Sequence, residues 1–281
     1  MIAAKQVLKR ARENNAVFYS GGVLVVTALV AIITPLISAN EYLTTDFDRI
    51  LHAPELAAMH LFGTDDLGRD LLVRTMMGIQ VTMVVAIVAS IVSLVIGVLY
   101  GAIAGYVGGR VDALMMRLVD TLYALPFIFF VILLMVAFER NFLLIFVAIG
   151  AVNWLDMARI VRGQTLSLKE REFVAAARLT GVSTGRIIFR HIAPNLIGIV
   201  VVYMTLTIPQ AILVESFLSF LGLGVQEPRT SLGALVDAGV NLMEGASWTL
   251  LIPAGLLAVL LMCFNFLGDG LRDFFDARHT T

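Results

Sequence analysis

Charged residues and cysteine are scarce in this 281-residue sequence, and hydrophobic residues are abundant. Only 15% of the residues are charged and 59% are hydrophobic, whereas a soluble domain is about one quarter charged. The mean hydropathy of +0.91 therefore excludes an ordinary soluble domain. The single cysteine, Cys263, excludes an intrachain disulfide. The net charge of −1 identifies no partner, and we expect no nucleic-acid binding.

The sequence motifs of common enzyme sites are also missing. The chain has no GxxxxGK[ST] loop, so it is not expected to bind ATP in the P-loop manner. It has no H-E-x-x-H, no Cys/His metal cluster and no G-x-S-x-G turn, and its four histidines are scattered. We therefore expect no catalytic residue, no cofactor, no metal site and no enzymatic activity of its own.

Six apolar runs instead predict an all-α membrane protein. A transmembrane helix needs about 20 mainly apolar residues. The fourth run is shorter, a length that also fits a buried or interfacial segment. The first run follows basic residues, like a signal peptide, but its length and the lack of an A-x-A site favour an uncleaved anchor. The predicted spans are Val17–Leu36, Val81–Tyr106, Leu118–Phe138, Phe142–Leu155, Leu196–Leu218 and Thr249–Leu267.

The distribution of Lys and Arg orients these spans. With six spans and the N-terminus inside, 15 basic residues lie on the cytoplasmic side and 5 outside. The positive-inside rule then favours six spans with both termini cytoplasmic. This gives an N-terminal tail at 1–16, a membrane domain at 17–268 and a C-terminal tail at 269–281.

The loop 159–194 is basic and helix-forming, and it holds seven of the twenty Lys and Arg residues. A folded basic loop beside a membrane either lies on anionic lipid or docks onto a soluble partner. Glu172 comes early and Arg178 late in a first short helix, which suits the helix dipole. Gly181 is expected to end that helix. Ser183 or Thr184 starts a second, which Pro194 is expected to end before the fifth span.

Three further features of the spans have two readings each. Gly97, Gly101 and Gly105, followed by Gly109 at the same spacing, predict one small-residue face, and a packing seam is favoured over a binding role. Pro209 marks either a simple kink or a broken helix beside a pathway. Glu215 is either a pathway residue or a water-exposed glutamate at the outer end of its span. The span centres are nearly free of charge, which argues against a proton-coupled carrier.

The stretch FVAAARLTGVSTGRIIFRHIAPN, from Phe173, resembles the EAA loop of importer-type ABC permeases. Ala176 and Ala177 match its two alanines, Gly181 its glycine and Pro194 its proline. Ala175 stands where the family usually has glutamate, and Glu172, one turn earlier, is a candidate replacement. In that family the loop docks on an ATPase subunit. The coupling residues implied are Glu172, Ala175, Ala176, Ala177, Arg178, Gly181, Arg186 and Pro194.

Other stretches resemble the dipeptide, oligopeptide and nickel permease family, closest to the C-type subunit of oligopeptide permeases. These stretches are HLFGTDDLGRDLLVR, FVAIGAVNWLDMARIVRGQTLSLK, SFLSFLGLGVQEP and FNFLGDGLRDFFDAR.

The resemblance implies a type I ABC importer permease fold with six transmembrane helices and a cytoplasmic two-helix coupling loop. It implies a bacterial inner-membrane protein, a second homologous permease, two ATPase subunits that bind ATP and Mg, and an extracytoplasmic peptide-binding protein. Membrane lipid would surround the spans. The substrate would be an oligopeptide, or alternatively a dipeptide, nickel or another small solute. The distant alternative is a self-contained channel or secondary carrier whose loop lies on lipid.

Overall fold

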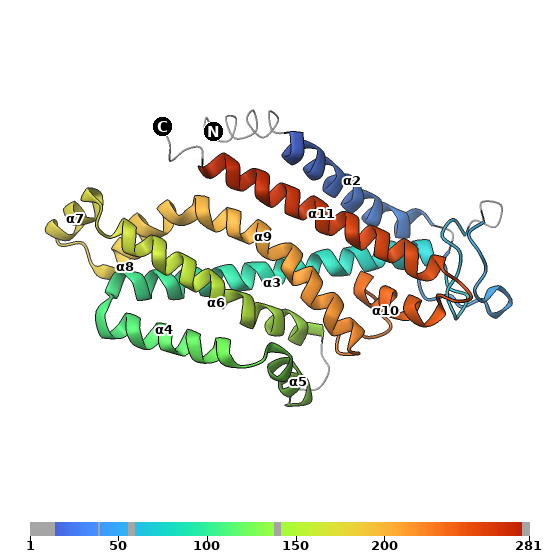
Figure 1. Cartoon of the computed structure of the whole chain (residues 1–281). Helices are drawn as coiled ribbons and strands as arrows, with labels where there is room; N and C mark the ends of the chain where they lie inside the picture. The colour runs from blue at the N-terminus through green and yellow to red at the C-terminus, as the bar shows by residue number, and fades with distance from the viewer. Residues whose placement is uncertain (1–14, 39, 56–59, 138–141, 277–281) are drawn as a thin grey trace. The chain divides into compact units, whose positions relative to one another are not determined.

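The computed structural model describes residues 15–38, 40–55, 60–137 and 142–276, and within these ranges the regular elements are helices (Figure 1). This confirms the predicted all-α class. The longer helices are α2 (Asn15–Ile37), α3 (Leu71–Val107), α4 (Gly109–Ala124), α5 (Phe127–Ala137), α6 (Phe142–Leu168), α9 (Ala193–Phe220), α10 (Leu232–Leu242) and α11 (Trp248–Asp276). The shorter ones are η1 (Phe47–Arg49), α7 (Glu172–Leu179), α8 (Thr184–Ile187) and the π-helical η2 (Ile188–Ile192).

Four helical stretches in the described part of the chain are long and apolar enough to cross a membrane. They are Asn15–Ile37, Leu71–Val107, Thr184–Phe220 and Trp248–Asp273. The first, second, fifth and sixth predicted spans lie within them. Pro35, Pro209 and Pro253 lie inside helices that continue past them, so the broken-helix reading of Pro209 is wrong.

The third predicted span is not one helix. It is divided where α4 ends at Ala124 and α5 begins at Phe127. Leu125 has extended backbone angles (φ −76°, ψ 129°), as expected for a residue that precedes a proline, here Pro126. The sequence pattern missed this break because both sides of it are apolar. The fourth predicted span lies within α6, which continues to Leu168.

Helix α3 begins ten residues before the predicted second span. The Asp70 Oδ1 atom accepts a hydrogen bond from the Val73 amide at 2.9 Å and so caps its first turn. Asp65, five residues earlier, does not contribute to this cap. Asp65 instead closes the preceding turn, where its Oδ1 atom accepts from the amides of Leu67 and Arg69, both at 2.9 Å.

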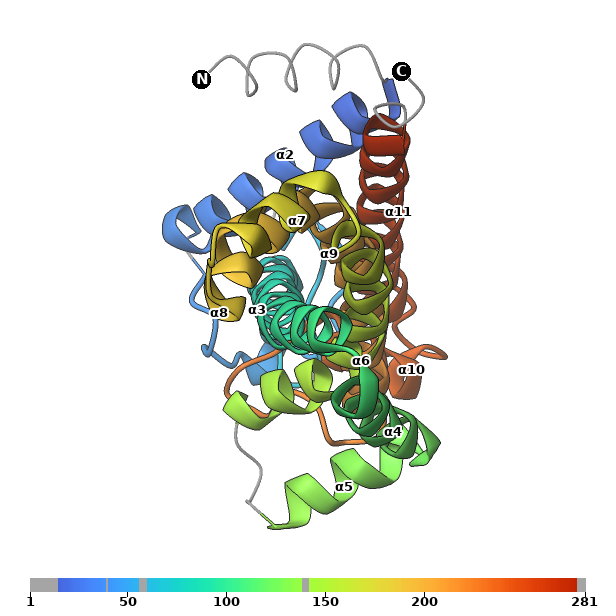
Figure 2. The same ribbon diagram turned by 90° about the vertical axis from the view of Figure 1, so that its left-hand side faces the viewer.

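The chain divides into two compact units, each described by itself. The first contains α2, α10, the start of α3, the end of α9 and most of α11. The second runs from Val88 to Thr207 and from Leu271 onward. Within the second unit, α4 and α5 both contact α6, and α4 lies along α6 in both ribbon views (Figures 1 and 2).

Candidate functional site

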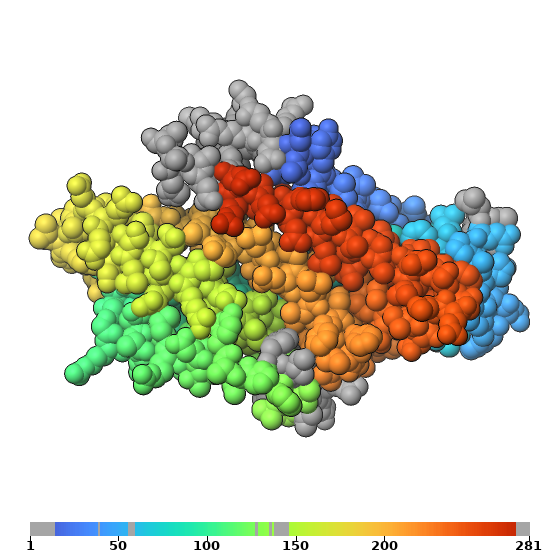
Figure 3. Space-filling view, in the orientation of Figure 1, coloured from blue at the N-terminus to red at the C-terminus, as the bar shows by residue number. Residues whose placement is uncertain are grey.

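The basic loop forms a small helical knob after α6. Helix α7 and the short α8 are joined by a turn, and the π-helical η2 leads from α8 directly into α9. In the space-filling view this segment, shown in yellow, forms one end of the second unit (Figure 3). The two short helices predicted from the sequence are therefore present.

The turn between α7 and α8 is built on Gly181. This residue has φ +75°, a backbone region that favours glycine. The Gly181 amide donates to the Arg178 carbonyl at 3.0 Å, and the Val182 amide donates to the Ala177 carbonyl at 3.1 Å. These are the two bonds of a Schellman cap, which fixes the direction of the chain as it leaves α7. A Cβ atom on Gly181 would meet no atom within 4 Å, so the requirement for glycine is conformational and not steric.

One face of the knob packs onto the helices beneath it. Val174 and Ala177 are buried on α7, and Ile187, Ile188 and Ile192 on α8 and η2. They share one apolar core with Ala102 of α3, with Met157 and Val161 of α6 and with Leu196 and Val200 of α9. Of the residues predicted for coupling, Ala177 thus belongs to the internal face of the knob.

The other face is open and partly apolar. Leu179 is 90% exposed and Phe189 65% exposed, although both are large hydrophobic residues. The remaining predicted coupling residues are also exposed: Glu172, Ala175, Ala176, Arg178, Gly181, Arg186 and Pro194. Sequence reasoning missed Leu179 and Phe189, although apolar residues in a basic loop were a signal.

Arg178 is held in place by the body of the second unit. Its guanidinium carbon lies 5.1 Å from the centre of the Tyr106 ring. Its Nε atom donates a hydrogen bond to the Tyr106 hydroxyl at 3.2 Å. Arg178 therefore ties the end of α7 to the end of α3.

Pro194 does not end the second helix as predicted. Helical structure runs from Thr184 to Phe220 without interruption. A proline ring collides with the carbonyl four residues earlier in a regular α-helix. Here the π-helical turn Ile188–Ile192 precedes Pro194, and its wider spacing leaves room for the ring.

The glycine face of α3 lies directly on α6. An added Cβ on Gly97 would meet the Met157 side chain at 2.5 Å, and one on Gly105 would meet the Arg162 carbonyl oxygen at 2.8 Å. Gly101, between them, lies against the Ala158 carbonyl. Gly109 does not belong to this face, because it has φ +58° and begins α4.

Residue 215 is enclosed within the first unit. The Glu215 side chain is fully buried, and its Oε1 atom accepts a hydrogen bond from the Ser219 hydroxyl at 2.9 Å. The Ser219 hydroxyl also lies 3.4 Å from the Ser231 hydroxyl, and the Oε2 atom of Glu215 is buried without a hydrogen-bond partner among the described residues. The reading of Glu215 as a water-exposed residue is therefore wrong for this chain. Pro209 is buried one turn and a half earlier in α9.

Two motifs far apart in the sequence meet in the first unit. The Glu227 Oε1 atom accepts from Arg74 Nη2 at 2.9 Å and from Arg69 Nη1 at 3.2 Å. Arg69 also pairs with Asp65 at 2.7 Å. Partial burial of Glu227 raises the pKa of its carboxyl group. The hydrogen bond and positive charge of Arg74, together with Arg69, outweigh this effect and hold that pKa below its usual value. No local sequence pattern indicates this pairing, because its partners lie more than 150 residues apart.

Comparison with known proteins identifies the family. The profile described as "Binding-protein-dependent transport system inner membrane component" matches residues 97–281. This chain belongs to that family. Together with its apolar helices, membership makes it a multi-pass inner-membrane protein and a permease component of a transport system.

Individual relatives match over nearly the whole length. The oligopeptide transport system permease protein OppC of Salmonella typhimurium is 57% identical over 96% of this chain and 89% of the relative. OppC of Bacillus subtilis is 42% identical over 98% of this chain and 89% of the relative. The dipeptide transport system permease protein DppC of Bacillus subtilis is 41% identical over 96% and 84%.

A solved structure of the MetNI methionine ABC transporter in inward-facing conformations shares the fold. Its TM-score is 0.57 at 20% identity, and it covers 72% of this chain and 95% of that chain. With the family match, this assigns the type I ABC importer permease fold.

Proposed function

We propose that this chain is one of two permease subunits of an ATP-driven oligopeptide importer. The observation that carries the proposal is the 57% identity to an oligopeptide permease over 96% of the chain. The oligopeptide and dipeptide permeases of Bacillus subtilis are 42% and 41% identical to this chain. A nickel pathway would want clustered carboxylates or histidines, and the predicted spans lack such clusters in their sequence.

The mechanism is alternating access. The six spans of this chain and those of a second homologous permease enclose the pathway, and a peptide-binding protein delivers substrate from outside. Two ATPase subunits bind ATP and Mg below the membrane, because this chain has no phosphate-binding loop. Their closure moves the docked knobs, and the permeases respond by rigid-body rotation.

The knob is the docking element in this scheme. The knob exposes two large apolar side chains, Leu179 and Phe189, and the charged Arg186 lies nearby in the sequence. Such side chains can anchor the knob in a cleft of an ATPase subunit. The buried face of the same knob joins it to α3, α6 and α9, so a displacement of the knob is passed to these helices. Glu172, at the start of α7, is placed to serve where the family glutamate is replaced by Ala175.

The orientation follows from the charge distribution, with both termini in the cytoplasm. A cysteine at position 229 is expected to label from outside, and one at 178 only from inside. Position 140, predicted to label from outside, lies outside the described residues. Labelling of position 178 from outside would contradict this membrane topology.

Uptake and crosslinking test the function together. A strain lacking this subunit is expected to lose import of tetra- and pentapeptides and to keep nickel import. A photocrosslinker at Leu179 is expected to capture an ATPase subunit, whereas one at Arg229 captures none. Continued import of both peptides in the deletion strain would refute the oligopeptide assignment. Crosslinks from Leu179 to lipid alone would favour the self-contained channel or carrier.

A further inference from the structure

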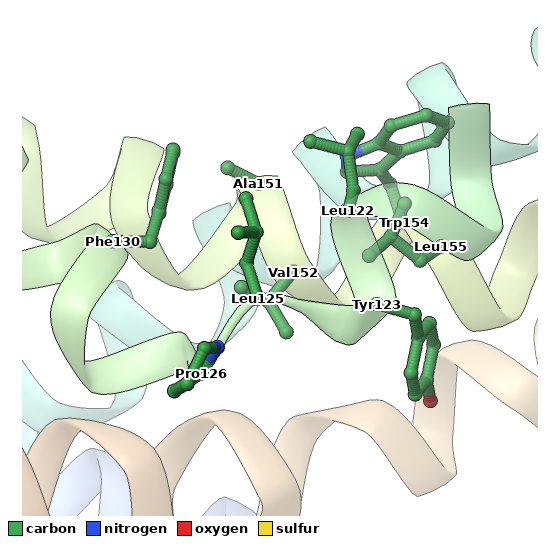
Figure 4. Close-up of a pocket in the computed structure, with 9 residues that line it drawn as sticks. All are labelled: Leu122, Tyr123, Leu125, Pro126, Phe130, Ala151, Val152, Trp154 and Leu155. Carbon is green, nitrogen blue, oxygen red and sulfur yellow. The ribbon is translucent and has the colours of Figure 1, made fainter.

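The helix break at Pro126 opens a cavity in the second unit. Its volume is about 450 Å³. Phe130 of α5 lies at one end of it and Trp154 of α6 at the other, with Ala151 between them (Figure 4). The lining residues are Leu122, Tyr123, Leu125, Pro126, Phe130, Ala151, Val152, Trp154 and Leu155. A continuous helix in place of the α4–α5 break would carry its side chains on through this region.

The inner wall of the cavity is firmly packed. The Trp154 ring meets the Tyr100 ring edge to face, with centroids 5.0 Å apart and planes at 70°. Trp154 and Leu155 are buried in one apolar cluster with Val119 and Ala158. Because this wall is packed from behind, the cavity has a fixed shape on that side.

A polar network borders the cavity at Tyr123. The Tyr123 hydroxyl donates to Asp156 Oδ1 at 2.6 Å, and the Arg159 guanidinium lies 4.3 Å from the centre of the Tyr123 ring. Arg159 also donates to Asp120 Oδ1 at 2.8 Å. Both hydrogen bonds join α6 to α4. Asp120, Asp156 and Arg159 are all exposed on the surface of the chain.

Exposed charges at the end of membrane helices indicate what this surface faces. Charged side chains in such segments turn toward protein or a water-filled cavity, because contact with hydrocarbon is costly. A cavity of this size, mainly apolar and aromatic with a few polar groups at one side, has the features of a ligand site. The border holds two carboxylates, Asp120 and Asp156, and one guanidinium, Arg159, so its net negative charge favours a peptide ammonium group over an anionic lipid headgroup.

We propose that this cavity is a subsite of the translocation pathway that receives a large apolar or aromatic side chain of the peptide in transit. Leu122, Phe130 and Trp154 surround that side chain. Asp156 and the Tyr123 hydroxyl face the polar backbone and the ammonium group of the peptide. This inference rests on the function proposed above. In the orientation proposed there, the charged border lies toward the cytoplasm, so the subsite serves the release side of the pathway.

Filling the cavity tests the assignment. Ala151 is half-buried and lines the cavity, so Ala151→Trp places a large side chain inside it. Val147 lies one turn earlier on α6, is 50% exposed and does not line the cavity, so Val147→Trp is the matched control. The assembled importer with its binding protein is reconstituted in liposomes. Uptake of Ala-Ala-Ala and of Ala-Phe-Ala is then measured.

Ala151→Trp is expected to lower the uptake of Ala-Phe-Ala relative to that of Ala-Ala-Ala by about tenfold, the scale on which an apolar pocket discriminates. Val147→Trp is expected to leave this ratio unchanged. Phe130→Ala, which removes one wall without overfilling the cavity, is expected to lower the same ratio and keeps the test decisive if Ala151→Trp fails to assemble. A peptide with benzoylphenylalanine at its centre is expected to crosslink within 122–130 or 151–155.

Three outcomes would overturn the inference. An unchanged ratio in both cavity variants, with no crosslink, would leave the cavity to lipid. Equal loss of both uptakes, with loss of the second permease on purification, would make it a subunit contact. If the unmodified importer takes up neither peptide, the function proposed above fails and this inference fails with it.

Discussion

Arg162 of α6 binds both carboxylate oxygens of Asp112 at the start of α4. The Nε–Oδ1 distance is 2.5 Å and the Nη2–Oδ2 distance is 2.7 Å. The backbone carbonyl of the same Arg162 lies against Gly105 of α3. One arginine therefore contacts α4 through its side chain and α3 through its backbone, and so helps to set the spacing of α3, α4 and α6 at the end of the glycine face.

Removal of the Asp112 charge is expected to destabilise the permease at neutral pH. The hydrogen bond from Arg162 lowers the pKa of Asp112, against the effect of burial. Because the pKa of Asp112 is lower in the folded state, its ionised carboxylate stabilises the fold fully above the unfolded-state pKa of about 3.9. This stabilisation is lost as the pH falls through the folded-state pKa. Asp112→Asn should cost about 2 kcal/mol at pH 7, between the values for exposed and buried ion pairs, because the Arg162 side chain is 34% exposed.

Thermal unfolding in detergent at pH 7 and at decreasing pH measures this effect. The gap between wild type and Asp112→Asn should narrow only at acidic pH. Glu170→Gln, at an exposed carboxyl in the same unit, is the control and should change neither curve. A gap that does not narrow at acidic pH would show that the charge of Asp112 contributes no stability.

Gly101 and Gly163 should respond in opposite ways to alanine. A Cβ on Gly101 would collide with the Ala158 carbonyl, so Gly101→Ala forces α3 and α6 apart. A Cβ on Gly163 of α6 meets no atom within 4 Å, so Gly163→Ala should be neutral or stabilise by up to about 1 kcal/mol. Unfolding of both variants by denaturing detergent checks this. If the two variants were equally stable, close packing of α3 on α6 at Gly101 would be contradicted.

Glu215 should tolerate glutamine better than leucine. Glutamine keeps an oxygen that accepts from Ser219, whereas leucine leaves the buried Ser219 hydroxyl without this acceptor. An unsatisfied buried polar group costs about 1–3 kcal/mol, so Glu215→Leu should lower the thermal midpoint clearly more than Glu215→Gln. The reverse order, measured on the purified permease pair, would argue against a hydrogen-bonding role.

Gly181→Val should separate ATP hydrolysis from import. Valine is strongly disfavoured at φ +75°, so the turn must change and α8 must tilt. We expect a subunit that inserts and holds its permease partner but imports no peptide, while the ATPase binds more weakly or hydrolyses ATP without import. Ala175→Glu, which restores the usual family residue, should tighten docking slightly.

Gly185→Val is the control for this change, because Gly185 lies in α8 with open space around it and without a positive φ. It should retain most of the import. Wild-type import by Gly181→Val would refute the role of the turn. Both variants are compared by peptide uptake and by ATP hydrolysis in liposomes.

The length of the apolar segments and the positions of turn-forming glycines could be predicted from the sequence. The helices around Val17–Leu36 and Thr249–Leu267 follow from composition alone. The turn at Gly181 follows from acid, base and glycine in sequence order. These features are local, so neighbouring residues specify them without knowledge of the tertiary structure.

Features that depend on tertiary contact could not be predicted. The helix breaks at Pro126 but continues through Pro194, which a π-helical turn precedes, so the residue type alone does not predict the outcome. The pairing of Glu227 with Arg74 depends on how the chain returns, which no local pattern encodes. Leu179 was not singled out because exposure, and not identity, makes it notable.

The π-helical segment Ile188–Ile192 has a consequence for the phase of the helix. A π-turn holds one residue more than an α-turn, and one residue corresponds to about 100° of rotation. The azimuth of the knob about the axis of α9 is therefore set by a single extra residue. The number of residues in this segment therefore sets the direction in which the knob docks. A one-residue deletion there would rotate the exposed face of the knob away from its docking direction, although every side chain of that face would remain.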